Sequence, residues 1–502
     1  MKNRLTIALM LANLLLGVSH VSWADKNPET PQFWLDSGIN AIEAAEKLTS
    51  NKKYAKNVIL FVGDGMGIST ITAARILEGQ TLPDNRGGEE HSLSFERLPY
   101  VALSKTYSAN QQTPDSAPTM TAIITGVKTN DGELSVDGTV RHQEKSAEVI
   151  NAHKLKTLLE QAEEKGLSTG VVSTARITHA TPAACYAHTS GRDWESDADV
   201  PAGVGINDIA RQLVDFPYGN GLEVVLGGGR EKFLPNTQPD PEDTDKKGSR
   251  KDGLDLTQQW LNHHPKSVYV YNKAGFDAID ARQVDHLLGL FERSHMHYEH
   301  DRPNDKGGEP SLTEMTAKAI EILSRNKKGY FLMVEAGRID QAHHEGNAFR
   351  ALTDTVELSN AVRKALEKTD NRNTLIIVTA DHSHTFTIAG YPERGNPILG
   401  LVKEPGEVNL AKDKNGNPYT TLSYANGPGY RAATSPLALT NEETMHPDFL
   451  QASAVPLARE THAADDVVIF ATGPKAYLFH GVQEQTYIYQ VMAKALKFKP
   501  GR

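Results

Sequence analysis

Uninterrupted apolar runs recur along the chain, and most of them end at a glycine or a polar side chain. Short runs of this kind are typical of strands that are buried on both faces of a parallel sheet. Segment 100–107 instead alternates apolar and polar residues and is predicted as a further strand. Together these patterns predict strands at 58–62, 100–107, 170–174, 222–226, 330–334, 373–381 and 467–471.

Apolar residues at helical spacing lie between many of these strands. They predict helices at 33–48, 68–77, 155–165, 313–324 and 351–366. Pro118 suits the first turn of a helix, so another helix should begin near Ser116. Segment 265–310 alternates short apolar and polar pieces and is assigned no element. Strands and helices in alternation predict an α/β fold, with a mostly parallel central sheet and helices on both faces.

Residues 1–24 have the pattern of a secretory signal peptide. Lys2 and Arg4 precede an apolar run at 5–16, and Ser22-Trp23-Ala24 is a small-x-small cleavage site. The run is too short to span a membrane. We predict cleavage after Ala24, a periplasmic or secreted protein, and a single domain at 25–502. The helix at 33–48 could pack on its own domain or reach a partner subunit.

Segment 388–455 differs in composition from the rest of the chain. Its many prolines and glycines predict turns and short strands, which we interpret as an insertion over the sheet. The formal net charge of −10 argues against a general basic surface for nucleic acid, so any anion site must be local. No second long apolar run follows, so no membrane association is expected after signal removal. Cys185 is the only cysteine, which excludes an internal disulfide, and we expect it to be buried.

Acidic and histidine side chains follow one predicted strand after another. Asp64, Glu335 and Asp381 each end an apolar run, and the carboxyl ends of parallel strands meet at one sheet edge. Other candidates in similar positions are Asp340, His344, His382 and His462. So many carboxylates and imidazoles can converge only if divalent cations neutralise them. Mixed Asp/His sets fit Zn²⁺, whereas an all-oxygen set of Asp64, Thr181 and Glu335 fits Mg²⁺ better.

Ser116 and Arg192 complete this set of candidate residues. Each is weak evidence alone, since a serine at a helix start is usually a cap and a loop arginine is usually solvated. A seryl oxygen beside two zinc ions, however, loses its proton easily. The pattern therefore favours phosphoryl transfer through a covalent seryl intermediate.

Six motifs, in this order along the chain, resemble those of alkaline phosphatases. They are Asp64-Gly-Met-Gly67, Pro114-Asp-Ser-Ala117, His179-Ala-Thr-Pro182, Arg338-Ile-Asp-x-x-His-His344, Thr379-Ala-Asp-His-Ser-His384 and Thr461-His-Ala463. The similarity runs from about Pro31 to Met492. It is greater to the animal-type enzymes, by His179, the stretch at Tyr391 and the 388–455 insertion. Residues 25–502 would then form the catalytic domain.

The resemblance implies roles for individual residues. The first zinc ion would be held by Asp340, His344 and His462. The second would be held by Asp64, Asp381, His382 and the Ser116 oxygen. One magnesium ion would be held by Asp64, Thr181 and Glu335. Arg192 would clamp two phosphate oxygens. His179 would contact waters around the magnesium, His384 would support the first zinc, and Tyr391 would reach the partner's site in a homodimer.

Two positions depart from the family pattern. The resemblance implies a calcium site at Glu242, Phe291, Glu292 and Glu309, but Glu309 stands where the family has an aspartate. Gln341 stands where the animal-type enzymes have a histidine, which would alter water contacts near the metals. The change at Gln341 would also affect catalytic tuning.

The expected function is hydrolysis of small-molecule phosphate monoesters through a phosphoserine, with release of inorganic phosphate. One alternative is a related phosphodiesterase, nucleotide pyrophosphatase or sulfatase, against which a third metal site at Thr181 and Glu335 argues. Another is a secreted metal- or phosphate-binding protein without turnover, which would need no serine at a helix start. The sequence predicts neither the natural substrate nor the pH optimum.

Overall fold

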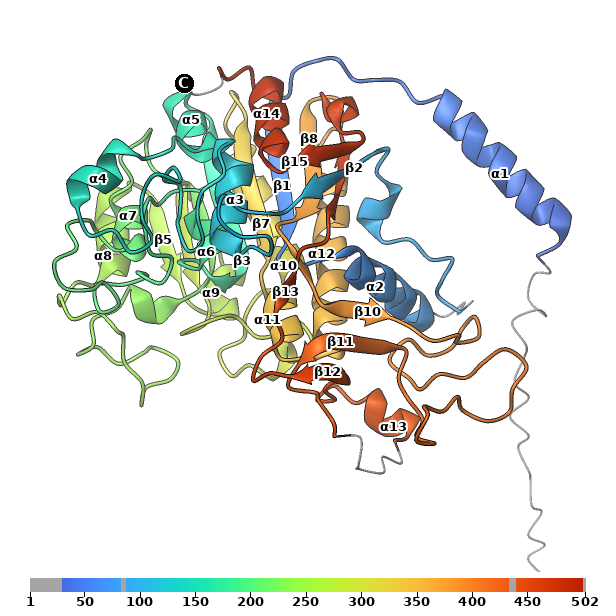
Figure 1. The fold of residues 1–502 in the computed structure, drawn as a ribbon. Helices are drawn as coiled ribbons and strands as arrows, with labels where there is room; N and C mark the ends of the chain where they lie inside the picture. Colours follow the sequence, from blue (N-terminus) through green and yellow to red (C-terminus); the bar gives the residue numbers. More distant parts are fainter. Residues whose placement is uncertain (1–28, 83–86, 433–438, 500–502) are drawn as a thin grey trace, which may run out of the picture. The chain divides into compact units, whose positions relative to one another are not determined.

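The computed structural model describes residues 29–82, 87–432 and 439–499, so the predicted signal peptide lies outside the described residues (Figure 1). The chain divides into two compact units, 1–48 and 49–502. The first contains α1 (Pro31–Glu46), whose start is capped by the Thr30 hydroxyl accepting a bond from Phe33 N at 3.2 Å. This is the helix predicted near 33–48. No helix among the described residues is long and apolar enough to cross a membrane.

The described part of residues 49–502 is built around a ten-stranded sheet in the order β15-β2-β14-β8-β1-β7-β3-β4-β6-β5. Within it only β14 runs antiparallel to its neighbours, which confirms the predicted mostly parallel α/β sheet. The strands are β1 (Asn57–Gly63), β2 (Tyr100–Lys105), β3 (Ser168–Arg176), β4 (Val224–Gly228), β5 (Ser267–Val270), β6 (His286–Leu290), β7 (Tyr330–Ala336), β8 (Thr374–Ala380), β14 (Val467–Thr472) and β15 (Val482–Glu484).

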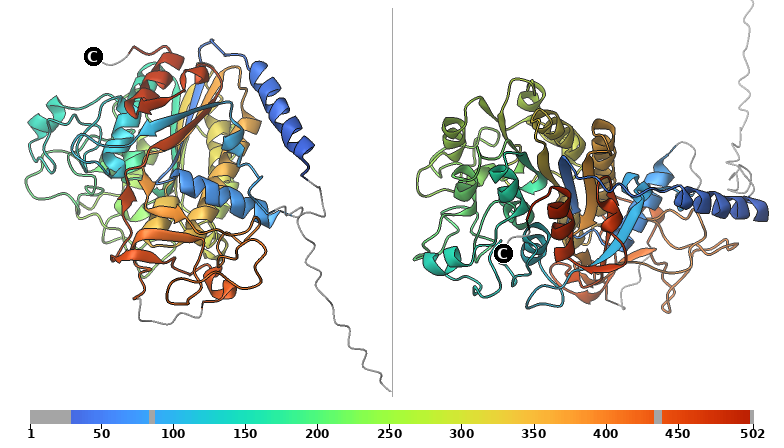
Figure 2. Two further views of the ribbon diagram at one scale, coloured as in Figure 1. Left: turned by 45° about the vertical axis from the view of Figure 1, so that its right-hand side comes forward. Right: turned by 90° about the horizontal axis from the view of Figure 1, so that it is seen from above.

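Strand β1 shows how one apolar run is buried on both faces. Its side chains alternate between two hydrophobic cores: Val58, Leu60 and Val62 belong to one, and Ile59 and Phe61 to the other. The first core contains residues of α3 (Ser116–Thr125), α5 (Leu158–Glu164) and α14 (Thr486–Ala495); the second contains residues of α2 (Ile68–Thr81), α10 (Leu312–Leu323) and α12 (Ala348–Lys368). Helices therefore cover both faces, as the views in Figure 2 show.

The remaining elements are short. The helices are α4 (Ala147–Ala152), α6 (Ala180–Ala183), α7 (Ile209–Val214), α8 (Leu256–His263), α9 (Lys273–Asp277), α11 (Arg338–His344) and α13 (Asn441–Thr444), with 3₁₀ turns η2 (Ser94–Arg97), η3 (Arg230–Lys232), η4 (Arg302–Asn304) and η5 (Ala476–Leu478). β10 (Phe386–Ile388), β11 (Leu422–Gly427) and β12 (Ser453–Pro456) form a separate sheet, whose strands lie within or at the ends of the predicted 388–455 segment. β9 (Ser383–His384) pairs with β13 (His462–Ala463).

The region at 265–310, to which the sequence assigned no element, contributes strands β5 and β6 to the main sheet. His286 and Gly289 interrupt the apolar pattern of β6, so the sequence pattern did not identify this strand. A Cβ at Gly289 would come within 2.6 Å of the Phe291 ring and 2.7 Å of the Leu226 side chain on β4, so a larger residue would require these buried side chains to shift. Cys185 is buried as predicted, and burial raises the pKa of its thiol.

Candidate active site

Three neighbouring strands bring the predicted acids to one edge of the sheet. Asp64 follows β1, Asp381 follows β8, and Glu335 lies near the end of β7. Registers such as Val62↔Glu335 and Gly63↔Ala380 place these positions side by side. Gly65, at φ 68°, donates its N–H to Asp381 Oδ1 at 3.0 Å, and a Cβ there would overlap the His384 ring. Only glycine therefore fits this turn.

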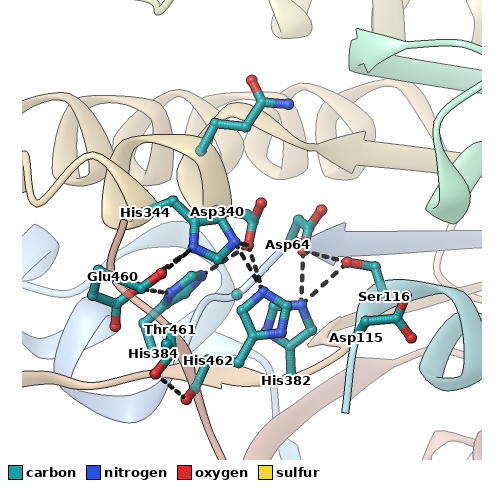
Figure 3. Close-up of polar contacts among 12 residues, drawn as sticks. Asp64, Asp115, Ser116, Asp340, His344, His382, His384, Glu460, Thr461 and His462 are labelled. Atoms are coloured by element: carbon teal, nitrogen blue, oxygen red, sulfur yellow. Dashed lines mark hydrogen bonds and ion pairs between the residues drawn. The ribbon is translucent and has the colours of Figure 1, made fainter. Parts of the chain in front are cut away.

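A first group of side chains surrounds one oxygen of Asp340. Asp340 Oδ1 lies 3.0 Å from His384 Nε2, 3.2 Å from His462 Nε2 and 3.3 Å from His344 Nε2 (Figure 3). The predicted i, i+4 pair of Asp340 and His344 does share a face, because both belong to α11. Burial lowers the pKa of His344, so its imidazole is neutral near pH 7 and able to bind a metal.

A second group surrounds Ser116. His382 Nε2 lies 3.2 Å from Asp64 Oδ1 and 3.4 Å from Asp381 Oδ2, and all three residues are fully buried. Ser116 Oγ is 3.4 Å from Asp64 Oδ1 and 3.2 Å from His382 Nε2. Asp115, not Ser116, is the N-cap residue of α3, and Ser116 is the first residue of the helix. Its hydroxyl therefore does not cap the helix but faces this acid and imidazole.

A third group consists of oxygen atoms that lack partners. Asp64 Oδ2, Thr181 Oγ1 and Glu335 Oε1 are buried, and none has a hydrogen-bond partner among the described residues. Burial and the neighbouring carboxylates raise the pKa of Asp64 well above its usual value, and burial raises that of Glu335 to about 7. Unpaired buried oxygens are costly, and a divalent cation would satisfy them. The first two groups fit zinc by their mixed N/O donors. In the third, ligand atoms of Asp64 and Glu335 lie within 4.8 Å of one another and of His179, and the oxygens fit magnesium.

The first group and Ser116 open onto a cavity of about 640 Å³, whose lining also includes Arg192 and Gln341. Arg192 Nη1 donates to Asp115 Oδ2 at 2.6 Å, and its Nη2 lies 3.1 Å from His179 Nε2. Burial and the nearby Arg192 lower the pKa of His179 to about 3. His179 is therefore neutral, accepts from Arg192, and helps to hold the guanidinium at the cavity wall.

Glu460 is the main residue of the site that the sequence interpretation missed. Its Oε2 accepts from His384 Nδ1 at 2.6 Å, its Oε1 accepts from Thr385 N at 2.7 Å, and its backbone oxygen accepts from His344 Nδ1 at 2.6 Å. Its only signal was proximity to Thr461-His462 in the sequence. Burial lowers the pKa of His384, but the Glu460 and Asp340 carboxylates overcome this and raise it to about 9.

We expect Glu460→Gln to weaken metal binding by about 10- to 100-fold, because the Glu460 carboxylate orients His384, which in turn contacts the Asp340 carboxylate. The loss should appear as faster release of metal to a chelator, with activity largely restored by excess zinc. The same substitution at exposed Glu407 is the matched control. Equal release rates in the two variants would show that Glu460 does not position the histidines.

The other predicted residues contact parts of the chain other than Ser116 or are exposed. Gln341 is hydrogen-bonded to Arg338, and its Nε2 is 2.9 Å from His295 Nδ1. Tyr391 follows β10 and is 80% exposed. Among the residues of the implied calcium site, Phe291 is fully buried, and Glu292 and Glu309 lie in a cluster with His297 and Asp305. Glu242 instead bonds Arg230 and Gly307.

Comparison with known proteins shows a match across nearly the whole chain. Residues 55–498 match the profile of the family described as alkaline phosphatase. The tissue-nonspecific alkaline phosphatase isozyme of Gallus gallus is 43% identical over 504 residues, covering 98% of this chain and 94% of that protein. The Homo sapiens isozyme is 42% identical over 485 residues, covering 94% and 90%.

Solved structures agree on the fold. Alkaline phosphatase from Thermus thermophilus has a TM-score of 0.64 at 23% identity, with 91% of this chain and 94% of that chain covered. The enzyme from the Antarctic bacterium TAB5 has a TM-score of 0.60 at 22% identity, with 89% and 99% covered. At such identities the solved structures support the fold alone. The family match and the 43% identity support membership of the enzyme family. The chain therefore belongs to the alkaline phosphatase family, whose members are enzymes that hydrolyse phosphate monoesters.

Proposed function

We propose that this protein hydrolyses phosphate monoesters through a phosphoserine at Ser116, in a site for two zinc ions and one magnesium ion. The observation that carries the proposal is the position of Ser116 Oγ. It lies 3.4 Å from Asp64 Oδ1 and 3.2 Å from His382 Nε2, in the lining of a cavity that also includes Arg192. A hydroxyl in this setting is a candidate nucleophile. Arg192, in the same cavity lining, is a candidate for binding the negatively charged phosphate group.

The three groups of donor atoms support an assignment of ligands. One zinc would be held by Asp340, His344 and His462, the other by Asp64, Asp381, His382 and the Ser116 oxygen, and magnesium by Asp64, Thr181 and Glu335. His179 and His384 would support them from outside. When bound, the ions supply Lewis acidity and hydroxide near neutral pH and above.

The chain's own residues would position the reacting groups. Ser116 lies in the first turn of α3, where free backbone N–H groups and the helix dipole favour negative charge. Arg192, held by Asp115 and His179, offers a planar fork that binds two phosphate oxygens and that a lysine could not reproduce. Ser116 Oγ would attack phosphorus in line with the ester oxygen, forming the Oγ–P bond as the ester P–O bond breaks. Water then hydrolyses the phosphoserine and regenerates the hydroxyl.

The proposal extends to the cellular setting and the assembly. The pattern at 1–24 supports export to the periplasm or the medium. The family resemblance supports a homodimer in which exposed Tyr391 reaches the partner subunit. The same proposal includes the 388–455 segment as an insertion over the active-site edge.

The decisive test compares a chromogenic phosphate monoester with the corresponding diester. We expect kcat/KM for the monoester to be at least about 100-fold higher, because a diester adds a group where Arg192 would bind a free oxygen. Release of inorganic phosphate should depend on added zinc and magnesium. Faster turnover of the diester would favour the phosphodiesterase alternative, and metal binding without turnover would favour a binding protein.

A further inference from the structure

A second cluster of metal-type ligands lies outside the candidate active site, between β6 and α10. It consists of Glu292, His297, Asp305 and Glu309, whose ligand atoms all lie within 4.8 Å of one another. Glu292 follows β6, Asp305 follows η4, and Glu309 precedes α10. All four residues thus belong to the loop between β6 and α10, and we call them the loop cluster.

The negative charge of the loop cluster is not balanced. Glu309 is only 2% exposed, and its Oε1 accepts from the backbone N–H of His297 at 2.8 Å. Glu309 Oε2 and Asp305 Oδ2 are also buried, yet neither has a hydrogen-bond partner in the described part of the chain. Unpaired buried oxygens at this point indicate room for a cation.

His297 contributes the only nitrogen donor of the loop cluster. Its Nδ1 lies 3.4 Å from Glu292 Oε1 and 3.5 Å from Glu309 Oε1. A protonated His297 imidazole, beside Glu309 Oε1, would be an alternative cation here. A single positive charge does not balance three carboxylates, however, and it leaves the two unpartnered oxygens unsatisfied. A divalent ion with a neutral imidazole ligand accounts for both.

The donor set does not fit the calcium that the family resemblance implies. Calcium takes about six to eight oxygen ligands and seldom a nitrogen. Glu242, an expected ligand, is not among the four residues whose ligand atoms lie together; its Oε2 accepts from Arg230 Nη2 and its Oε1 from Gly307 N, both at 2.9 Å. In its place the chain offers an imidazole, a ligand that suits first-row transition ions.

We propose that Glu292, His297, Asp305 and Glu309 bind one divalent first-row transition ion, Mn²⁺ or Zn²⁺, in preference to calcium. Three carboxylates and one imidazole match the borderline character of these ions. The ion would hold the loop in a fixed conformation. The same loop carries His295, whose ring lies beside Arg176 and Gln341 at the catalytic cavity. The loop cluster would thus stabilise one wall of that cavity without taking part in the chemistry.

The test titrates the zinc- and magnesium-loaded protein with Mn²⁺, Zn²⁺ and Ca²⁺ in turn. Bound metal is measured by elemental analysis after gel filtration, and the unfolding midpoint is measured in parallel. We expect the wild type to bind about one more Mn²⁺ or Zn²⁺ per chain than Glu309→Gln. His297→Gln should weaken Mn²⁺ and Zn²⁺ by at least about tenfold while binding Ca²⁺ no more weakly than the wild type.

His300→Gln, at an exposed histidine of the same loop, should behave as the wild type. Equal Mn²⁺ and Zn²⁺ binding by the wild type and His297→Gln would overturn the role of His297. Tighter Ca²⁺ than Mn²⁺ or Zn²⁺ binding by the wild type would overturn the class of ion. Equal metal content in folded wild type and folded Glu309→Gln would overturn the site itself and leave protonated His297 as its cation.

Discussion

Ser116→Ala is expected to lower kcat for a chromogenic phosphate monoester by about 10⁴-fold and to abolish covalent labelling by a phosphate donor. Removing a nucleophile costs most of the catalysed rate, and what remains comes from substrate binding and charge stabilisation by the rest of the site. The neighbouring Asp64 and His382 remain in place, so metal content should change little. Acid quench after brief incubation with a labelled monoester measures the phosphoserine directly.

Ser146→Ala is the matched control, because Ser146 also stands at a helix start but acts as a cap. Its Oγ accepts from Val149 N at 3.3 Å, so the substitution should cost about 1 kcal/mol of stability and leave labelling intact. Labelling that persists in Ser116→Ala would remove Ser116 from the nucleophilic role, and metal analysis of the same sample would show whether the site was still assembled.

The central strands could be predicted because their sequence is simple. Residues such as Val58 and Phe61 form an uninterrupted apolar run, and both faces of β1 are in fact buried. The acids at the ends of β1, β7 and β8 could be placed at one edge for the same reason, since parallel strands share a direction. Where polar or glycine residues replace apolar ones, as at His286 and Gly289 of β6, the pattern no longer identifies the strand.

Supporting residues were harder to predict than the candidate ligands. Glu460, His295 and His297 lie in loops, and their importance depends on contacts with residues distant in sequence. No local spacing encodes that the Glu460 carboxylate meets His384 or that His297 meets Glu309. The position of Ser116 was similarly ambiguous, because the same residue types serve as helix caps, and only the structure shows Asp115 at the cap position.

Metal removal is the second change with a large expected effect. Dialysis against a chelator should lower activity by more than about 10³-fold, because loss of even one stabilising group at developing charge costs 10²–10³. It should also destabilise the protein, since Asp64, Asp381 and Glu335 are fully buried and would be left without cations. Zinc and magnesium together should restore both activity and the unfolding midpoint.

The stabilisation by metal should increase between pH 5 and pH 8. Without metal, burial and neighbouring acids raise the pKa of Asp64, and burial raises that of Asp381 and, to about 7, that of Glu335. A carboxyl with a raised pKa binds its proton more tightly when folded, so the metal-free protein loses stability as pH rises through this range. Burial lowers the pKa values of His344 and His382, so these ligands release fewer protons on binding metal than ordinary imidazoles would.

Glu335 and the buried acids beside it should together account for a difference on the order of 3 kcal/mol between the loaded and metal-free proteins at pH 8 relative to pH 5. Paired thermal unfolding curves of the two forms across this range measure it. Glu335→Gln removes the titrating group while keeping its size, so the pH dependence of the metal effect should become shallower. A gap in unfolding midpoint that stays constant from pH 5 to pH 8 would contradict the view that buried, proton-binding carboxyls make the site depend on its cations.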